Sequence, residues 1–260
     1  WLGKALASHL SANGYALKVT TRTKLKQQAL LDEGFDTCLL STDDGIESSN
    51  LIFAQDILVI AITPGFKRGN TDYALNIANL VQCAENKQVK KIVLIRSTGI
   101  YQGLEGEVDE NTSLNLSQHK SKILFEAEQS VVNFSGSGKV LRLSGLVSEN
   151  RKPGKFLAGK KALAGANAAV NLIHRADCIG LLQAIIEQEV SHKIFIGVSN
   201  THCSKSDFYS QAARHLGLVA PEFDLTKADE SNRKVLGENT RNWLNYAYQK
   251  DDLLHWLKHS

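Results

Sequence analysis

Short apolar segments alternate with helical patterns along the first 147 residues, and this alternation constrains the fold more than any other feature. The clearest apolar segments are residues 56–63 (D-I-L-V-I-A-I-T) and 91–95, which are hydrophobic at consecutive positions. A strand that is apolar on both faces must be buried on both faces, as are the inner strands of a parallel sheet covered by helices. We therefore predict an α/β fold with a doubly wound, mainly parallel sheet.

The remaining elements follow from the same two periodicities. Helices are predicted over residues 2–10, 24–33, 74–88, 117–133, 178–189 and 206–215, and further strands over 15–21, 37–40, 139–143, 170–174 and 193–198. Because the sequence opens directly on a helical pattern, we expect the first strand of the sheet to be missing at the N-terminus. We place a nucleotide-binding domain in residues 1–147 and a smaller substrate lobe in residues 148–260, with elements that return to the main sheet.

Composition excludes several classes of protein. The formal net charge is only +3, with both signs scattered along 260 residues, which predicts neither a nucleic-acid partner nor a membrane partner. No apolar run approaches the roughly 18 residues of a membrane span. The 4 cysteines are too far apart for a metal knuckle or a disulfide framework, so no metal is predicted and a reducing compartment is indicated. We expect a cytoplasmic monomer or homodimer with a small-molecule substrate.

The opening segment W-L-G-K-A-L-A suits the start of a dinucleotide-binding helix. Such folds place glycines between the first strand and helix, so that amides can approach a pyrophosphate. Gly3 fits the third glycine of the pattern G-x-G-x-x-G, with Trp1 and Leu2 as the two residues before it. A single glycine here has a purely structural alternative, so this assignment depends on the rest of the pattern.

The end of the second expected strand of the fold, V-T-T-R-T-K, indicates which dinucleotide is bound. NAD-binding folds present an Asp or Glu here to the adenosine ribose hydroxyls. Thr21, Arg22, Thr23 and Lys24 offer hydroxyls and cations instead, which suit a ribose 2′-phosphate. Of the two cations, Arg22 is the stronger candidate, because a guanidinium can grip phosphate bidentately. NADP(H) is therefore predicted in preference to NAD(H). The alternative is a solvated, basic start to a helix.

Four segments together resemble one known superfamily. They are W-L-G-K-A-L-A, A-I-T-P-G, K-I-V-L-I-R-S-T-G-I-Y-Q-G and V-N-L-I-H-R-A-D, which span residues 1–177 in this order. They are similar to the atypical, extended short-chain dehydrogenases/reductases of the NAD-dependent epimerase/dehydratase-like group. The third segment is the most specific, because a buried strand that ends in S-T-G-x-Y carries this family's Ser/Thr position beside the reacting centre.

The resemblance implies roles for residues after two strands. Those along the ribose and pyrophosphate of the cofactor would be Ala61, Ile62, Thr63 and Pro64. Ser97 would orient the substrate beside the cofactor, with Thr98 as its alternative in the substrate pocket. The Ser97 hydroxyl could equally cap the turn after its strand. Tyr101 is kept as a catalytic candidate, although it also suits packing of that turn.

The family's catalytic pair is Tyr-x-x-x-Lys on the next helix, where one turn brings both side chains to the same face. Lys122 matches the lysine, which would hold the nicotinamide ribose, and Gln118 occupies the tyrosine position. Glutamine can neither donate a proton as an acid nor accept one as a base. His119 is titratable but projects about 100° away from that face. We therefore predict that Gln118 faces the cofactor crevice and that His119 does not replace the tyrosine.

Two later segments complete the predicted site. L-R-L-S-G-L-V resembles the strand and turn that pass the nicotinamide, which places Ser144 and Gly145 against the cofactor. V-N-L-I-H-R-A-D resembles a segment that faces the substrate pocket, with Asn171 and His174 among its polar members. His174 could instead be a structural histidine, and Asp177 is predicted to cap the helix from residue 178.

These features favour an NADP(H)-dependent oxidoreductase, or an epimerase/dehydratase-type homologue, with a small-molecule substrate such as a sugar nucleotide. The missing tyrosine favours a second hypothesis, in which the chain is a catalytically silent NADP(H)-binding regulatory or redox-sensing protein. A third reading is an α/β domain without a nucleotide, because a fold alone does not decide function.

Overall fold

The computed structural model describes residues 1–42, 45–46, 51–66, 69, 72–227 and 232–259. The chain forms two compact units. Unit 1 contains Trp1–Ile95 and Ile123–Val140, and unit 2 contains Arg96–Lys122 and Leu141–Ser260. Unit 2 therefore includes residues 96–122 and 141–147 in addition to the whole of the lobe predicted over residues 148–260.

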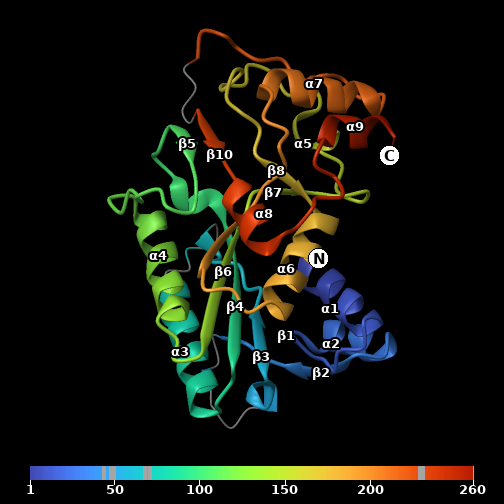
Figure 1. Cartoon of the computed structure of the whole chain (residues 1–260). Helices are drawn as coiled ribbons and strands as arrows, with labels where there is room; N and C mark the ends of the chain where they lie inside the picture. Colours follow the sequence, from blue (N-terminus) through green and yellow to red (C-terminus); the bar gives the residue numbers. More distant parts are fainter. Residues whose placement is uncertain (43–44, 47–50, 67–68, 70–71, 228–231, 260) are drawn as a thin grey trace. The chain divides into compact units, whose positions relative to one another are not determined.

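Parallel pairing dominates the strands, as the alternating pattern predicts (Figure 1). Four strands form the largest sheet, in the order β3-β4-β6-β9, with bounds Ile57–Ile60, Lys91–Ser97, Ser137–Leu143 and Ile194–Gly197. Three further parallel pairs are β1 (Lys18–Thr21) with β2 (Asp36–Leu39), β5 (Gly106–Val108) with β10 (Arg233–Val235), and β7 (Gly145–Val147) with β8 (Leu172–His174). The predicted α/β fold with a mainly parallel sheet is confirmed.

Helices connect these strands throughout the described chain. Their bounds are α1 Leu2–Ala12, α2 Lys24–Asp32, α3 Tyr73–Asn86, α4 His119–Val132, α5 Gly154–Leu157, α6 Arg175–Glu187, α7 Lys205–His215, α8 Glu238–Leu244 and α9 Leu253–Lys258. Short 3-10 helices cover Leu51–Phe53 (η1) and Thr98–Tyr101 (η3). Most helices lie within a few residues of their predicted positions, because their apolar spacing and capping residues set the ends.

In unit 1, the core forms where apolar faces meet. Helix α1 buries Leu6, Ala7 and Leu10, which the 3.6-residue period places on one face. The backbone of α4 comes so close to β6 that a Cβ at Gly138 would lie 1.8 Å from the Val131 carbonyl oxygen. Only glycine fits at that position, so the sequence itself permits this close approach.

Helix α2, by contrast, buries none of its residues. Its start is capped by Thr23, whose hydroxyl accepts from the Lys26 amide at 3.4 Å. This helix depends on local capping and on contact with β1 and β2 rather than on a buried face.

Several predicted boundaries are wrong, and each difference has a local cause. The predicted strand 56–63 ends at Ile60, because residues 61–65 run without regular structure into Gly65, whose φ is +72°. Helix α6 begins at Arg175 rather than at residue 178, because His174 caps it. The polar C-terminal stretch, for which no elements were predicted, contains β10, α8 and α9, which have short or weakly periodic patterns.

Candidate functional site

In unit 1, the start of α1 lies against the end of β3. A Cβ built on Gly3 would lie 3.8 Å from the Ala61 Cβ, an ordinary contact distance. Trp1 is 47% exposed and occupies the N-cap position without a side-chain hydrogen bond to the helix. The structure thus brings the predicted glycine beside the predicted post-strand segment, and the N-cap side chain does not cap the amides of the first turn.

The residues after β3 differ in how far they are exposed. Ala61 and Thr63 are exposed, whereas Ile62 and Pro64 are half-buried. The Ile62 carbonyl accepts from the hydroxyl of the buried Tyr73 at 3.4 Å. This bond ties the segment to α3 and leaves the side chain of Thr63 at the surface.

The end of β1 presents an exposed cation. Thr21 is the last residue of the strand and is half-buried, while Arg22 is exposed. The Arg22 guanidinium forms no hydrogen bond or ion pair with any residue that the structure describes. Thr23 serves as the N-cap of α2, so its hydroxyl already has a structural partner. Arg22 is therefore the residue at this strand end that is most available to an anion.

In unit 2, Ser97 ends β4 and begins the turn formed by η3. Its Oγ accepts from the Gly99 amide at 3.0 Å, so the expected capping role is present. The side chain is nevertheless exposed. Because the capping bond uses the oxygen only as an acceptor, the hydroxyl proton is still available to a substrate oxygen.

Tyr101, at the end of the same turn, is fully buried and has a structural role. Its hydroxyl donates to the Asp109 carbonyl at 2.6 Å and accepts from Arg142 Nη1 at 2.7 Å. These bonds use its proton and one lone pair, which fits the packing role that the sequence also suggests, and its catalytic role stays a prediction. Thr98 is also buried, with 7% of its surface exposed, which argues against its place in an open substrate pocket.

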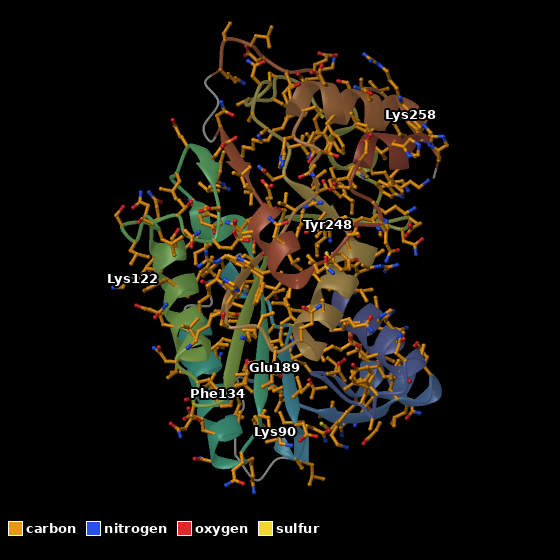
Figure 2. All side chains as sticks on the ribbon, viewed as in Figure 1. Lys90, Lys122, Phe134, Glu189, Tyr248 and Lys258 are labelled. Carbon is orange, nitrogen blue, oxygen red and sulfur yellow. The ribbon has the colours of Figure 1, made fainter. Side chains whose placement is uncertain are left out.

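Gln118 and Lys122 occupy one end of α4 in different ways. Gln118 lies at the N-cap, where its carbonyl accepts from the Lys122 amide at 3.0 Å. A Cβ built on Gly103 would lie 3.3 Å from Gln118 Cγ, so the Gln118 side chain lies on the turn after η3. Lys122 (labelled in Figure 2) and His119 are exposed. The glutamine thus packs on a glycine, while the lysine is at the surface.

Ser144 and Gly145 follow β6 in a closely packed stretch. Ser144 is 5% exposed, and its hydroxyl has no hydrogen-bond partner among the described residues. A Cβ on Gly145 would lie 2.6 Å from Leu172 Cδ2, so a larger residue would force the Leu172 side chain to shift. The buried hydroxyl without a partner is the feature of this stretch that a polar ligand would satisfy.

His174 is held within the fold by polar and ring contacts. It is 2% exposed, its Nδ1 accepts from the Ala176 amide at 3.2 Å, and its Nε2 lies 3.1 Å from a Glu149 carboxylate oxygen. Burial is the largest influence on its pKa, which lies below the ordinary value. Trp256 packs edge-on against the ring at 4.8 Å. These contacts fit the structural alternative that the sequence left open, and the substrate-pocket assignment of His174 stays a prediction.

Asp177 and Asn171 also hold the fold together. Asp177 is fully buried and accepts from the backbone amides of Gln249 (2.6 Å) and Lys250 (3.1 Å). It does not cap α6, so that prediction is wrong. Asn171 donates to the Arg233 carbonyl at 2.7 Å and accepts from the Val235 amide at 2.8 Å. The sequence contains no signal for these partners, because they lie 62 to 73 residues away along the chain.

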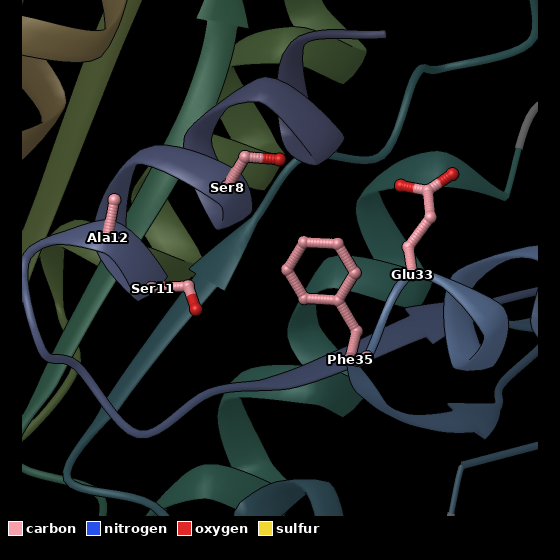
Figure 3. Close-up of a pocket in the computed structure, with 6 residues that line it drawn as sticks. Ser8, Ser11, Ala12, Glu33 and Phe35 are labelled. Atoms are coloured by element: carbon pink, nitrogen blue, oxygen red, sulfur yellow. The ribbon is translucent and has the colours of Figure 1, made fainter.

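A surface pocket of about 480 Å³ lies elsewhere in unit 1, near the C-terminal ends of α1 and α2 (Figure 3). It is lined by Ser8, Ser11, Ala12, Glu33, Gly34 and Phe35. None of these is a predicted site residue, and the Glu33 carboxylate is already paired with Lys4 at 2.6 Å.

The described residues contain no group of three or more His, Cys, Asp or Glu side chains placed to hold a metal ion. No helix among them is long and apolar enough to cross a membrane.

Comparison with known proteins identifies relatives and structural neighbours. Protein YeeZ of Escherichia coli K12 is 31% identical over 98% of this chain and 94% of its own length. The human epimerase family protein SDR39U1, solved with NADPH, matches with a TM-score of 0.71 at 17% identity, covering 100% of this chain and 95% of that protein. The UDP-glucuronic acid 4-epimerase of Bacillus cereus, solved with NAD, matches with a TM-score of 0.75 at 14% identity over 99% and 91%. No model of a known protein family matches the sequence.

Proposed function

Because this chain belongs to the family of Protein YeeZ and has the NAD(P)-binding Rossmann fold of the extended short-chain dehydrogenases, we propose that it binds NADP(H) and acts on a small molecule. The reaction class is that of an oxidoreductase or an epimerase/dehydratase-type homologue. Sugar nucleotides are the substrate class implied by the resemblance, and the Bacillus cereus neighbour is named for one.

The observation that carries the choice of NADP(H) is the exposed Arg22 at the end of β1. Its guanidinium has no partner among the described residues, and the strand end carries no acidic side chain. A guanidinium grips a phosphate through two parallel hydrogen bonds, whereas a ribose hydroxyl pair is held by a carboxylate. Thr21 adds a hydroxyl at the same strand end.

Two features of the structure fit a bound dinucleotide. The N-cap side chain of α1 does not cap the first turn, and amides at a helix start bind anions such as a pyrophosphate. In unit 2, the buried Ser144 hydroxyl has no partner among the described residues, and a ligand amide or hydroxyl would satisfy it.

The proposed roles follow from these positions and from the resemblance. Bound NADP(H) supplies a hydride donor or acceptor. The residues that would hold it are Trp1, Leu2, Gly3, Thr21, Arg22, Ala61, Ile62, Thr63, Pro64, Ser144, Gly145 and Lys122, with Thr23 limited by its capping bond. Ser97 would donate its hydroxyl proton to a substrate oxygen, since only its acceptor side is used by Gly99.

A second candidate function is favoured by one observation. Gln118 occupies the family's tyrosine position and packs on Gly103, and it cannot transfer a proton. With Tyr101 engaged in structural bonds, neither residue would then supply the acid of this reaction class. A catalytically silent NADP(H)-binding protein, regulatory or redox-sensing, is consistent with this arrangement.

Calorimetry on the full-length protein tests cofactor binding. We expect NADPH to bind at least tenfold more tightly than NADH, and Arg22→Ala to remove most of that difference, since a charge-assisted hydrogen bond contributes about 1.5–3 kcal/mol. Lys24→Ala is the matched control, because Lys24 is also an exposed cation at the start of α2. An unchanged NADPH:NADH ratio in Arg22→Ala would show that the specificity assignment is wrong.

A screen of metabolites for NADPH turnover distinguishes the two candidate functions. If the protein is an enzyme, Lys122→Ala should abolish turnover, and Gln118→Tyr should leave it unchanged or raise it. His119→Phe should cost less than tenfold, or under about 1.4 kcal/mol of barrier. Loss of turnover in a folded His119→Phe variant would identify His119 as the proton donor instead. Tight NADPH binding without turnover on any tested class supports the silent candidate.

A further inference from the structure

The turn that presents Ser97 is held at its far end by a residue from the C-terminal strand. Helix η3 has only four residues, Thr98–Tyr101, and such short 3-10 helices have poor internal hydrogen bonds. The Tyr101 carbonyl, at its end, accepts from Arg233 Nη1 at 2.6 Å. These two residues are 132 positions apart in the sequence.

The side chain of Tyr101 holds the same end of the turn. Its hydroxyl is bonded to the Asp109 carbonyl and to Arg142, and the Arg142 guanidinium carbon lies 5.2 Å from the ring centroid. Tyr101 is therefore fixed at its ring, its hydroxyl and its carbonyl. Only the restraints on the carbonyl act directly on the backbone of the turn. The Leu104 amide also donates to this carbonyl, at 3.2 Å, but Arg233 is the charged and shorter-range donor of the two.

Arg233 is itself placed by hydrogen bonds on both sides of β10. On one side β10 pairs with β5, with Arg233 opposite Gly106, and the Gly106 amide donates to the Asn232 carbonyl at 2.9 Å. On the other side, the Asn171 amide group bonds the backbone at Arg233 and at Val235, much as a neighbouring strand would. The backbone from which the Arg233 side chain extends is thus held on both sides.

The charge of Arg233 has no ion-pair partner among the described residues. The side chain is half-buried, and burial lowers the pKa of the guanidinium below its ordinary value. Its neighbour Lys234, on the same strand, pairs with Glu107 at 3.0 Å. The two adjacent cations of this strand therefore have different partners. Lys234 forms a surface ion pair, whereas Arg233 donates a hydrogen bond to the turn.

We propose that Arg233 is a positioning residue that keeps the Ser97 hydroxyl oriented by fixing the carbonyl end of η3. The inference rests on the proposed function, because the orientation of Ser97 matters to chemistry only if Ser97 contacts a substrate. Arg233 touches neither Ser97 nor a reacting atom in this scheme, so it acts through the turn.

The Gly99 amide is a direct reporter of this role. It donates to Ser97 Oγ, so its hydrogen exchange rate, measured by NMR, reports whether that bond is formed. Ser97→Ala sets the rate for a turn without the bond. The Leu236 amide, which donates to the Val108 carbonyl at 2.8 Å, reports separately whether β10 remains paired.

Arg233→Met keeps the aliphatic stem but removes every donor. We expect it to speed Gly99 exchange by roughly tenfold or more, toward the Ser97→Ala rate, with Leu236 exchange unchanged. Arg233→Lys, which keeps a charged donor, should restore much of the protection. Lys234→Ala is the matched control and should alter neither rate. NADPH affinity should stay within about twofold in all three variants.

Unchanged Gly99 exchange in Arg233→Met would overturn the proposal. So would a joint loss of protection at Gly99 and Leu236 in both Arg233→Met and Arg233→Gln, because the whole strand would then support the turn. Loss of NADPH binding in Arg233→Met alone would place Arg233 in the cofactor site and also overturn the role. Failure of the proposed function appears differently, as absence of NADPH binding by the unsubstituted protein, whereas the exchange rates need no cofactor. Once turnover is found, Arg233→Met should lower kcat with KM unchanged.

Discussion

The predicted site residues of unit 1 and those of unit 2 differ in how their polar groups are used. In unit 1, Arg22 is exposed and without a partner among the described residues, and Thr63 is exposed. In unit 2, Tyr101 and His174 are buried and hydrogen-bonded to their own fold. The residues of both units are predicted site residues from the same set of motifs. The difference teaches that a motif locates a polar residue, whereas its burial and partners decide whether it can serve a ligand.

The strongest test of this contrast is Asp177→Ala. Removing the buried carboxylate leaves the amides of Gln249 and Lys250 without their acceptor, so we expect a loss of about 3 kcal/mol in the free energy of unfolding. Urea denaturation measures the change. Asp32→Ala, at an exposed carboxylate in unit 1, is the control and should change stability by less than about 0.5 kcal/mol. Equal losses of unfolding free energy in both variants would contradict the difference proposed between buried and exposed polar groups.

Tyr101→Phe should have the next largest effect. The substitution deletes the hydroxyl that accepts from Arg142 and donates to the Asp109 carbonyl, at a fully buried position. We expect a loss of about 2 kcal/mol in unfolding free energy with NADPH affinity unchanged. Arg22→Ala should show the reverse pattern, with affinity lost and stability kept. A Tyr101→Phe variant of full stability but no turnover would support Tyr101 as a catalytic residue.

Acid should weaken the start of α6 through His174. Its pKa is lowered in the folded protein, mainly by burial, with Lys250 acting in the same direction and Glu149 and Asp177 opposing. A depressed folded pKa means that the stabilisation is present above the unfolded value, near 6.5, and is lost as the pH falls below it. Protonation also turns the Nδ1 acceptor of the cap into a donor.

We therefore expect the unfolding free energy to fall by about 1 kcal/mol between pH 7 and pH 5 through this group. His174→Asn, which keeps a capping side chain, should flatten that part of the profile. Identical acid profiles of the two proteins would assign the dependence to other groups.

The smallest expected effect is that of Thr23→Ala. The capping bond at 3.4 Å is long and exposed, and α2 buries no residue, so we expect a loss of about 0.5 kcal/mol. Calorimetry of NADPH binding to this variant then tests whether Thr23 also contacts the cofactor. NADPH affinity that falls by more than a few-fold would show that the threonine both caps the helix and contacts the cofactor, whereas an unchanged affinity would leave it a cap alone.

The fold could be predicted where a pattern is local. The apolar residues of β3 and β4, the helical spacing of α1 and the turn after Ser97 all lie within short windows of sequence. Each of these elements is present at its expected place, although β3 ends earlier than predicted, at Ile60. The mainly parallel pairing followed from strands that are apolar on both faces.

The partners of polar side chains could not be predicted in this way. Three polar side chains form hydrogen bonds with groups that are 62 to 132 residues away, those of Asn171, Asp177 and Arg233. Nothing in the local sequence indicates these partners. The contact of Gln118 could not be predicted for a related reason, because it is made with Gly103, a glycine with φ +81° in a different segment. Helical spacing predicts which side chains share one face of a helix. It does not predict which residues of other segments pack against that face.

The bond from Arg233 to Tyr101 has a consequence for how the protein is made. Residues 96–122 leave the ribosome long before β10, and at about 5–20 residues per second the 132 intervening residues take roughly 7 to 26 s to synthesise. During this interval the Tyr101 carbonyl has no hydrogen bond from Arg233. The Asn171 side chain likewise has no contact with β10. Unit 2 therefore cannot complete its packing until β10 has been synthesised. A ribosome stalled before Arg233 would expose a nascent chain with an unfinished turn to chaperones and proteases.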